Sequence, residues 1–127
     1  MFPSIFAVAI GGAMGSLARF STIILSQWLF AGRFPLGTLL VNSSGSFLVG
    51  FFMSFYMERL EDAELLRLFV VVGFLGGYTT FSSFAWDTFT LYANDQWIAA
   101  LCNLLLNNLI AISLLILGVQ LGRLTGS

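Results

Sequence analysis

Long apolar runs alternate with short polar or turn-forming stretches along the chain. Four runs are separated in this way, and they cover residues 2–30, 35–57, 65–92 and 97–121. Each exceeds the roughly 20 residues that a helix needs to cross the hydrocarbon core of a bilayer. Because the connections are short, consecutive helices are expected to lie antiparallel. The pattern predicts an all-α membrane protein in which residues 1–127 form a single four-helix transmembrane domain.

The composition supports a membrane protein and excludes several other classes. Of the 127 residues, 58% are hydrophobic and 9% are charged, which departs strongly from soluble domains. A net charge of -1 with five basic side chains offers no patch for nucleic acid. Histidine is absent and Cys102 is the only cysteine, so residues for a metal cluster, a disulfide or acid–base catalysis are missing. We do not expect an enzyme.

The third run contains a segment that disfavours a continuous helix. Gly76 and Gly77 are followed closely by the β-branched pair Thr79 and Thr80. Backbone groups freed by a break inside lipid need protein, water or an ion as partners. The third helix is therefore predicted to be broken at its middle, where turn carbonyls are candidates to hold a small cation such as sodium. The alternative is a glycine kink that only lets helices cross.

Polar residues recur at helical spacing in the second and fourth runs. Thr38, Asn42 and Ser46 follow one another every four residues, and Asn103 and Asn107 repeat this spacing. Such residues share one face of a helix. They either join neighbouring helices through hydrogen bonds or line a route of hydrogen-bond donors.

Two charged residues and an aromatic pair add candidate chemistry inside the spans. Arg19 and Asp87 are costly in a bilayer unless they find partners. Arg19 either reaches the membrane interface or adds positive potential to a water-filled vestibule, and Asp87 either accepts hydrogen bonds along a route or bonds to another helix. Phe81 and Phe84 lie on one helix side, and their positive ring edges can favour an anion; the alternative is apolar filling.

The arginines are nearly balanced between the two sides of the predicted bundle. Arg59, Arg67 and Arg123 lie on the side of the termini, whereas Arg33 and, depending on its depth, Arg19 lie on the other. Such a weak bias permits insertion in both directions. Four spans are few for a protected pathway with its supporting shell, so subunits are expected to associate.

Small residues are spaced for close helix approach in the first and last spans. Gly11 pairs with Gly15, and Gly118 pairs with Gly122. These pairs serve either packing within one subunit or a dimer seam.

Three motifs together resemble a known family. In chain order they are Gly12-x-x-Gly15-x-x-x-Arg19, Gly37-Thr38-Leu39-Leu40-Val41-Asn42, and Gly73-Phe74-Leu75-Gly76-Gly77-Tyr78-Thr79-Thr80-Phe81-Ser82-Ser83-Phe84. With this order, length and span count, the chain resembles the Fluc/CrcB family of fluoride ion channels.

The resemblance implies a passive fluoride channel that exports the ion across the bacterial inner membrane. It further implies a dual-topology homodimer with an inverted copy, two fluoride pathways and a structural sodium ion at the dimer centre. By motif position, the carbonyls of Gly76 and Thr79 would hold sodium, and Arg19 would sit in the aqueous vestibule. The fluoride pathway would comprise Asn42, Phe81, Ser82, Ser83, Phe84, Thr38 and Asp87.

Some positions depart from the family pattern, and two other functions stay open. The family commonly has Ser at Ala85, Glu at Asp87, and a Gly-Ser pair at Ile110 and Ala111. One alternative is a small dual-topology multidrug exporter, although the first span lacks the deep carboxylate that such a carrier needs. The other is a non-conducting membrane assembly subunit whose polar stripes only pack against partner helices.

Overall fold

The computed structural model describes residues 1–30, 32 and 34–125. In these residues, four helical segments are long and apolar enough to cross a membrane: Phe2–Leu29, Leu36–Met57, Glu64–Ala93 and Trp97–Thr125. The predicted all-α fold class with four spanning helices is thus confirmed, and the last helix continues past the predicted end at residue 121. Arg33, one of the arginines in the charge comparison, lies outside the described residues.

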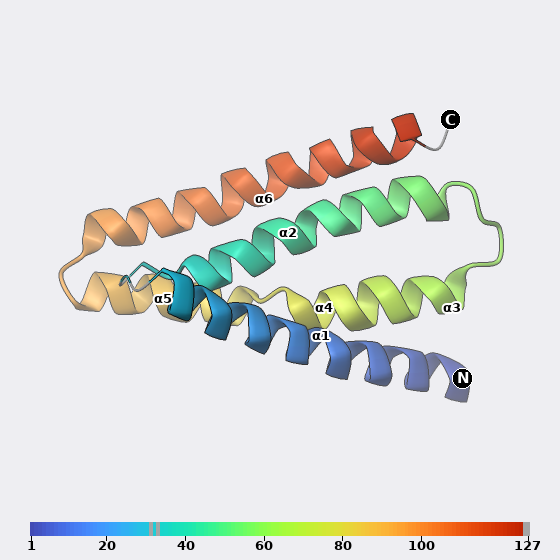
Figure 1. Cartoon of the computed structure of the whole chain (residues 1–127), viewed down its shortest axis with the longest axis horizontal. Helices are drawn as coiled ribbons and strands as arrows, with labels where there is room; N and C mark the ends of the chain where they lie inside the picture. The colour runs from blue at the N-terminus through green and yellow to red at the C-terminus, as the bar shows by residue number, and fades with distance from the viewer. Residues whose placement is uncertain (31, 33, 126–127) are drawn as a thin grey trace.

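Each spanning segment is built from one or more helical elements, of which Figure 1 labels the α-helices. The second and third segments contain stretches of π-helix, η1 and η2, in addition to α-helix. In chain order the elements are α1 (Phe2–Leu29), α2 (Leu36–Phe52), η1 (Met53–Met57), α3 (Glu64–Arg67), η2 (Leu68–Leu75), α4 (Gly76–Tyr78), α5 (Phe81–Ala93) and α6 (Trp97–Thr125).

The chain reverses direction at alternating ends of the bundle (Figure 1). α6 packs extensively along α2, and α1 packs extensively along η2 and α4. α5 makes most of its contacts with α6. The junction between α4 and α5 lies near mid-length of the bundle (Figure 1), where α4 contacts α1 and α5 contacts α6.

The small-residue pairs of the first and last spans bring helices together inside one subunit. A Cβ atom at Gly11 or Gly15 would overlap the backbone of η2, and one at Gly118 or Gly122 would overlap the second span. Glycine removes this steric barrier and lets the backbones approach. The atoms that would be overlapped are the carbonyl oxygens of Phe69, Phe74 and Phe47 and the hydroxyl of Ser54.

The interior of the chain is rich in polar groups, whereas large apolar side chains face outward. The largest fully buried side chains are Val41, Asn103 and Ser54. By contrast, Phe2 is 74% exposed and Trp28 is 85% exposed. Lipid is as apolar as leucine, so burial of apolar surface gives little attraction between helices in a bilayer. Close packing and interhelical hydrogen bonds must therefore hold this bundle together.

Candidate functional site

The helical backbone stops at Tyr78 and resumes at Phe81. Between them Thr79 has φ and ψ of -82° and 157°, and Thr80 has -151° and 116°, so both residues are extended. Threonine suits this conformation because its branched side chain favours extended backbone. The Thr80 hydroxyl also accepts a hydrogen bond from the backbone N–H of Ser83 at 3.1 Å, as an N-cap residue does.

Gly76 and Gly77, which the sequence suggested as helix-breaking together with Thr79 and Thr80, both have helical backbone in α4. The extended residues follow them. Gly77 instead permits close packing, because a Cβ atom there would lie 2.7 Å from the carbonyl oxygen of Gly12 on α1. Gly77 therefore lets α4 pack closely against α1, and the residues with extended backbone are the two threonines.

Asn42 of α2 pairs with both backbone groups of Thr80. Its Nδ2 donates to the Thr80 carbonyl at 3.1 Å, and its Oδ1 accepts from the Thr80 N–H at 2.8 Å. Thr80 is only 8% exposed, so without this side chain its peptide groups would lack partners away from water. The Asn42 amide therefore compensates the loss of helical hydrogen bonds.

A chain of hydrogen bonds continues from Asn42 through α6 and back to α5. Asn42 Nδ2 donates to Asn107 Oδ1 at 3.0 Å, and Asn107 Nδ2 donates to Asn103 Oδ1 at 2.9 Å. Asn103 Nδ2 then donates to Thr88 Oγ1 at 2.9 Å. Finally, the Thr88 hydroxyl donates to the Phe84 carbonyl at 2.8 Å. We call these residues, from Asn42 to Thr88, the amide relay.

The direction of the amide relay is set by its first member. The Thr80 N–H can only donate, so the Asn42 atom facing it must be the oxygen, and this leaves the Asn42 nitrogen toward Asn107. The same reasoning fixes the Asn107 and Asn103 amides in turn. Asn103 is completely buried and Asn107 is 5% exposed, so both need these partners.

A cavity of about 220 Å³ opens beside the extended residues. It brings together the second-span polar stripe, the aromatic pair and the fourth-span amides. The Phe81 and Phe84 rings meet edge to face with centroids 5.4 Å apart. Phe84 is 6% exposed whereas Phe81 is 77% exposed, so only Phe84 is enclosed by its own chain. The lining residues are Asn42, Ser46, Thr79, Thr80, Phe81, Phe84, Asn107, Asn108 and Ala111.

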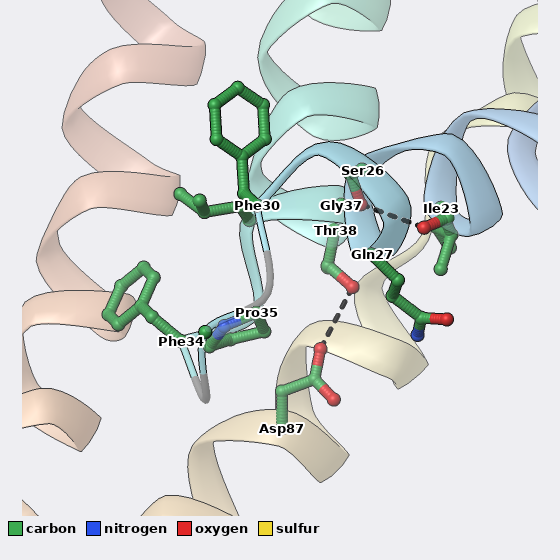
Figure 2. A pocket seen from close by; sticks show the side chains of 11 residues that line it. Ile23, Ser26, Gln27, Phe30, Phe34, Pro35, Gly37, Thr38 and Asp87 are labelled. Atoms are coloured by element: carbon green, nitrogen blue, oxygen red, sulfur yellow. Dashed lines mark hydrogen bonds between the residues drawn. The ribbon is translucent and has the colours of Figure 1, made fainter.

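The structure separates the remaining predicted pathway residues from this cavity. Ser82 and Ser83 lie in the first turn of α5 but do not line it. Thr38 and Asp87 line a second cavity of about 240 Å³ beneath the α1–α2 connection. There the Thr38 hydroxyl donates to Asp87 Oδ2 at 2.8 Å, and Figure 2 shows the two side chains meeting from α2 and α5. One stripe on α2 thus supplies residues to both cavities.

Arg19 contacts the end of the helical segment before the extended residues. Its Nε donates to the Gly77 carbonyl at 3.0 Å, and its side chain is half-buried between α1 and α4. Carbonyls at a helix C-terminus carry partial negative charge, so a guanidinium group is stabilising there. The expected location of Arg19 in an aqueous vestibule stays a prediction.

Two backbone N–H groups near the extended residues bind side chains instead of the carbonyls that they would bind in a continuous helix. In a continuous helix the Thr80 N–H would bind the Gly76 carbonyl, and the Ser83 N–H would bind the Thr79 carbonyl. Here the Thr80 N–H binds Asn42 Oδ1, and the Ser83 N–H binds the Thr80 hydroxyl. Oxygen ligands of this kind suit a hard monovalent cation. Among the described residues, no group of three or more His, Cys, Asp or Glu side chains competes as a metal site.

Sequence reasoning missed the parts played by Thr80 and Thr88. Thr80 carried a usable signal, because threonine directly before a helical stretch is a preferred N-cap. Thr88 carried none, because its pairing with Asn103 depends on how α5 is rotated against α6.

Comparison with known proteins agrees with the three motifs. The family model described as "CrcB-like protein, Camphor Resistance (CrcB)" matches residues 6–119. A Legionella pneumophila (strain Paris) protein named fluoride-specific ion channel FluC is 41% identical over 117 residues, covering 92% of this chain and 87% of that protein. Proteins of the same name from Desulforapulum autotrophicum and Geobacter metallireducens are also 41% identical. The first match covers 92% of this chain and 94% of that protein, and the second covers 94% of this chain and 97% of that protein. The resemblance is confirmed, and the chain belongs to the CrcB-like protein family.

Proposed function

We propose that this chain forms a passive channel that conducts fluoride out of the cytoplasm across a bacterial inner membrane. Relatives that match most of its length carry the name fluoride-specific ion channel. The observation that carries the proposal is the extended pair Thr79 and Thr80 within a spanning segment, satisfied by Asn42 beside a polar cavity. Non-helical backbone at membrane depth is tolerated where it is buried in protein or lines a cavity.

The proposed route offers fluoride neutral donors in series. Fluoride is small and strongly hydrated, so protein groups must replace its water without binding it too tightly for release. The Asn42 amide and the ring edges of Phe81 and Phe84 serve this purpose at the first cavity. Thr38 and Asp87 lie further along the α2 stripe, at the second cavity. Ser82 and Ser83 add hydroxyls on α5, and Arg19 adds positive potential.

The proposed channel is an antiparallel homodimer with a sodium ion between the two copies. Gly76 is exposed on the surface of one subunit, and a Cβ atom there would lie 3.5 Å from the Val71 carbonyl oxygen, an ordinary contact distance. The carbonyls of Gly76 and Thr79 from one chain are too few for a sodium shell, so the same pair from an inverted copy would complete it. The nearly balanced arginines support insertion in both orientations.

Fluoride efflux from liposomes tests the proposed conduction. Purified protein is reconstituted in vesicles loaded with potassium fluoride, and a potassium ionophore removes the opposing voltage before fluoride is measured outside. Rapid passive release supports a channel, with chloride-loaded vesicles as the selectivity control. Proton-coupled uptake of hydrophobic cations without fluoride release would indicate an exporter, and the absence of both would indicate an assembly subunit.

The sodium proposal needs a separate test. Protein is purified in sodium and then transferred to a bulky organic cation that cannot fit between backbone carbonyls. We expect lower thermal stability and lower fluoride flux, both restored by returning sodium. Unchanged stability and flux after the exchange would exclude a structural sodium ion.

A further inference from the structure

Both N–H donors of the Asn42 amide are occupied within the chain. One N–H of Nδ2 binds the Thr80 carbonyl at 3.1 Å and the other binds Asn107 Oδ1 at 3.0 Å. The oxygen accepts from the Thr80 N–H at 2.8 Å. An anion needs a donor, and an amide nitrogen has only two N–H bonds to give. An anion can therefore bind Asn42 only by replacing one of its two present acceptors.

The two acceptors differ in how easily they can be replaced. The Thr80 carbonyl belongs to a two-sided pair with Asn42, so replacing it would also disturb the bond between the Thr80 N–H and Asn42 Oδ1. The Asn107 contact is a single bond between two residues that both line the 220 Å³ cavity. Thr80 lines the same cavity, so an ion there can reach both contacts, but only the Asn107 contact can be broken without disturbing a second bond of Asn42.

Asn107 is held in place from behind by the rest of the amide relay. Its Nδ2 donates to both the backbone and the side-chain oxygens of Asn103, at 3.0 and 2.9 Å. Asn103 is in turn fixed by Thr88. Bonds that all donate in one direction polarise one another and gain strength. Asn107 therefore keeps its oxygen directed at Asn42.

We propose that Asn107 Oδ1 is the resident acceptor of the Asn42 donor and that fluoride replaces it on entering the cavity. This inference rests on the proposed fluoride pathway. The exchange breaks one hydrogen bond of Asn42 and forms another, while the Asn107 oxygen stays without its donor for as long as the ion is bound. When the ion moves on, the Asn107 oxygen takes the donor back and assists release. Asn103 and Thr88 act as positioning residues, because they hold Asn107 in the orientation that this exchange needs.

The concentration dependence of fluoride flux tests the exchange. Asn107→Leu removes the competing acceptor at similar size, so we expect the fluoride concentration for half-maximal flux to fall about two- to tenfold, the range for one net hydrogen bond. The maximal flux should fall as well, since release loses its assistance. Gln120→Leu is the matched control: it removes an exposed amide from the same helix, and its curve should equal the parent's.

Thr88 provides a second pair of variants that does not alter Asn107. Thr88→Val keeps the shape but removes the hydroxyl that orients Asn103, and it should shift the half-maximal concentration in the same direction. Thr88→Ser keeps the hydroxyl and should restore the parent curve. A purely structural role would lower the amount of folded dimer in each variant without moving the half-maximal concentration.

The outcomes separate this inference from the proposed function. Curves for Asn107→Leu and Thr88→Val that superimpose on the parent's after scaling to maximal flux would overturn the exchange while leaving conduction intact. If Asn107→Leu does not fold, the comparison of Thr88→Val with Thr88→Ser decides alone, and equal curves overturn the inference. Absence of fluoride flux in the parent protein would instead refute the proposed function.

Discussion

Replacing Asn42 with leucine tests whether one side chain maintains the extended residues. Leucine has similar volume but no polar atoms, so the Thr80 N–H and carbonyl lose their partners together. Asn107 Oδ1 loses its donor as well. An unsatisfied buried group costs about 1–3 kcal/mol, and three such groups cost about 3–9 kcal/mol if the backbone does not move. The backbone has an alternative, because the Thr80 N–H can return to the Gly76 carbonyl and extend α4.

This alternative gives the Asn42→Leu variant a distinctive signature. The variant should melt at a lower temperature than the parent, and it should lose any stabilisation by sodium because the Gly76 carbonyl is consumed. Thermal unfolding of the purified protein is measured in sodium and in a bulky organic cation. Asn42→Asp retains an oxygen for the Thr80 N–H and should keep the sodium response. Its second oxygen faces the Thr80 carbonyl and Asn107 Oδ1, so its melting temperature should also fall, and its negative charge repels fluoride and stops flux.

Two results would refute the reasoning. If Asn42→Leu keeps both the melting temperature and the sodium response of the parent, Asn42 does not maintain the extended residues. If Asn42→Asp conducts fluoride like the parent, Asn42 does not belong to the pathway.

Three other perturbations follow from exposure and packing. Phe81→Ile and Phe84→Ile both delete a ring edge and should reduce fluoride flux in liposomes, but only the buried Phe84 should also lower the melting temperature, and parent-like flux in both would remove the rings from the pathway. Gly15→Ala should lower the yield of folded protein in gel filtration, because its Cβ overlaps a carbonyl of η2. Gly32→Ala meets open space and should behave like the parent. Arg19→Gln should lower the melting temperature by weakening the bond to the α4 carbonyl, and Arg19→Lys should recover part of it; equal melting temperatures for all three proteins would exclude this role.

The sequence predicts the helices better than the contacts between them. The four spans follow from apolar length alone, which bilayer thickness dictates. Thr38, Asn42 and Ser46, which the sequence spaces four residues apart, all line cavities in the structure. In the segment expected to be interrupted, the threonines are extended and the glycines are helical. Propensity could not separate the two, because it does not distinguish a glycine used for close packing from one used for a turn.

Contacts between distant segments could not be predicted in the same way. Asn42 binds Thr80 because α2 presents this face to the third span, and the rotation of one helix against another is not encoded in a local pattern. Arg19 illustrates the same limit, since its partner is a backbone carbonyl 58 residues away and any residue type could supply one. Side-chain identity restricts what a residue can bind, whereas packing selects the partner.

The polar interior also makes this fold conditional on its solvent. In water, every internal amide and hydroxyl would find competing partners, and the net gain from each pairing would shrink. The outward phenylalanines and tryptophans would meanwhile be driven to cluster with one another. Lipid reverses both tendencies at once, so the surrounding membrane helps to determine which conformation of this chain is the stable one. Detergents that admit water to the bundle should therefore loosen it from within, starting at the asparagines.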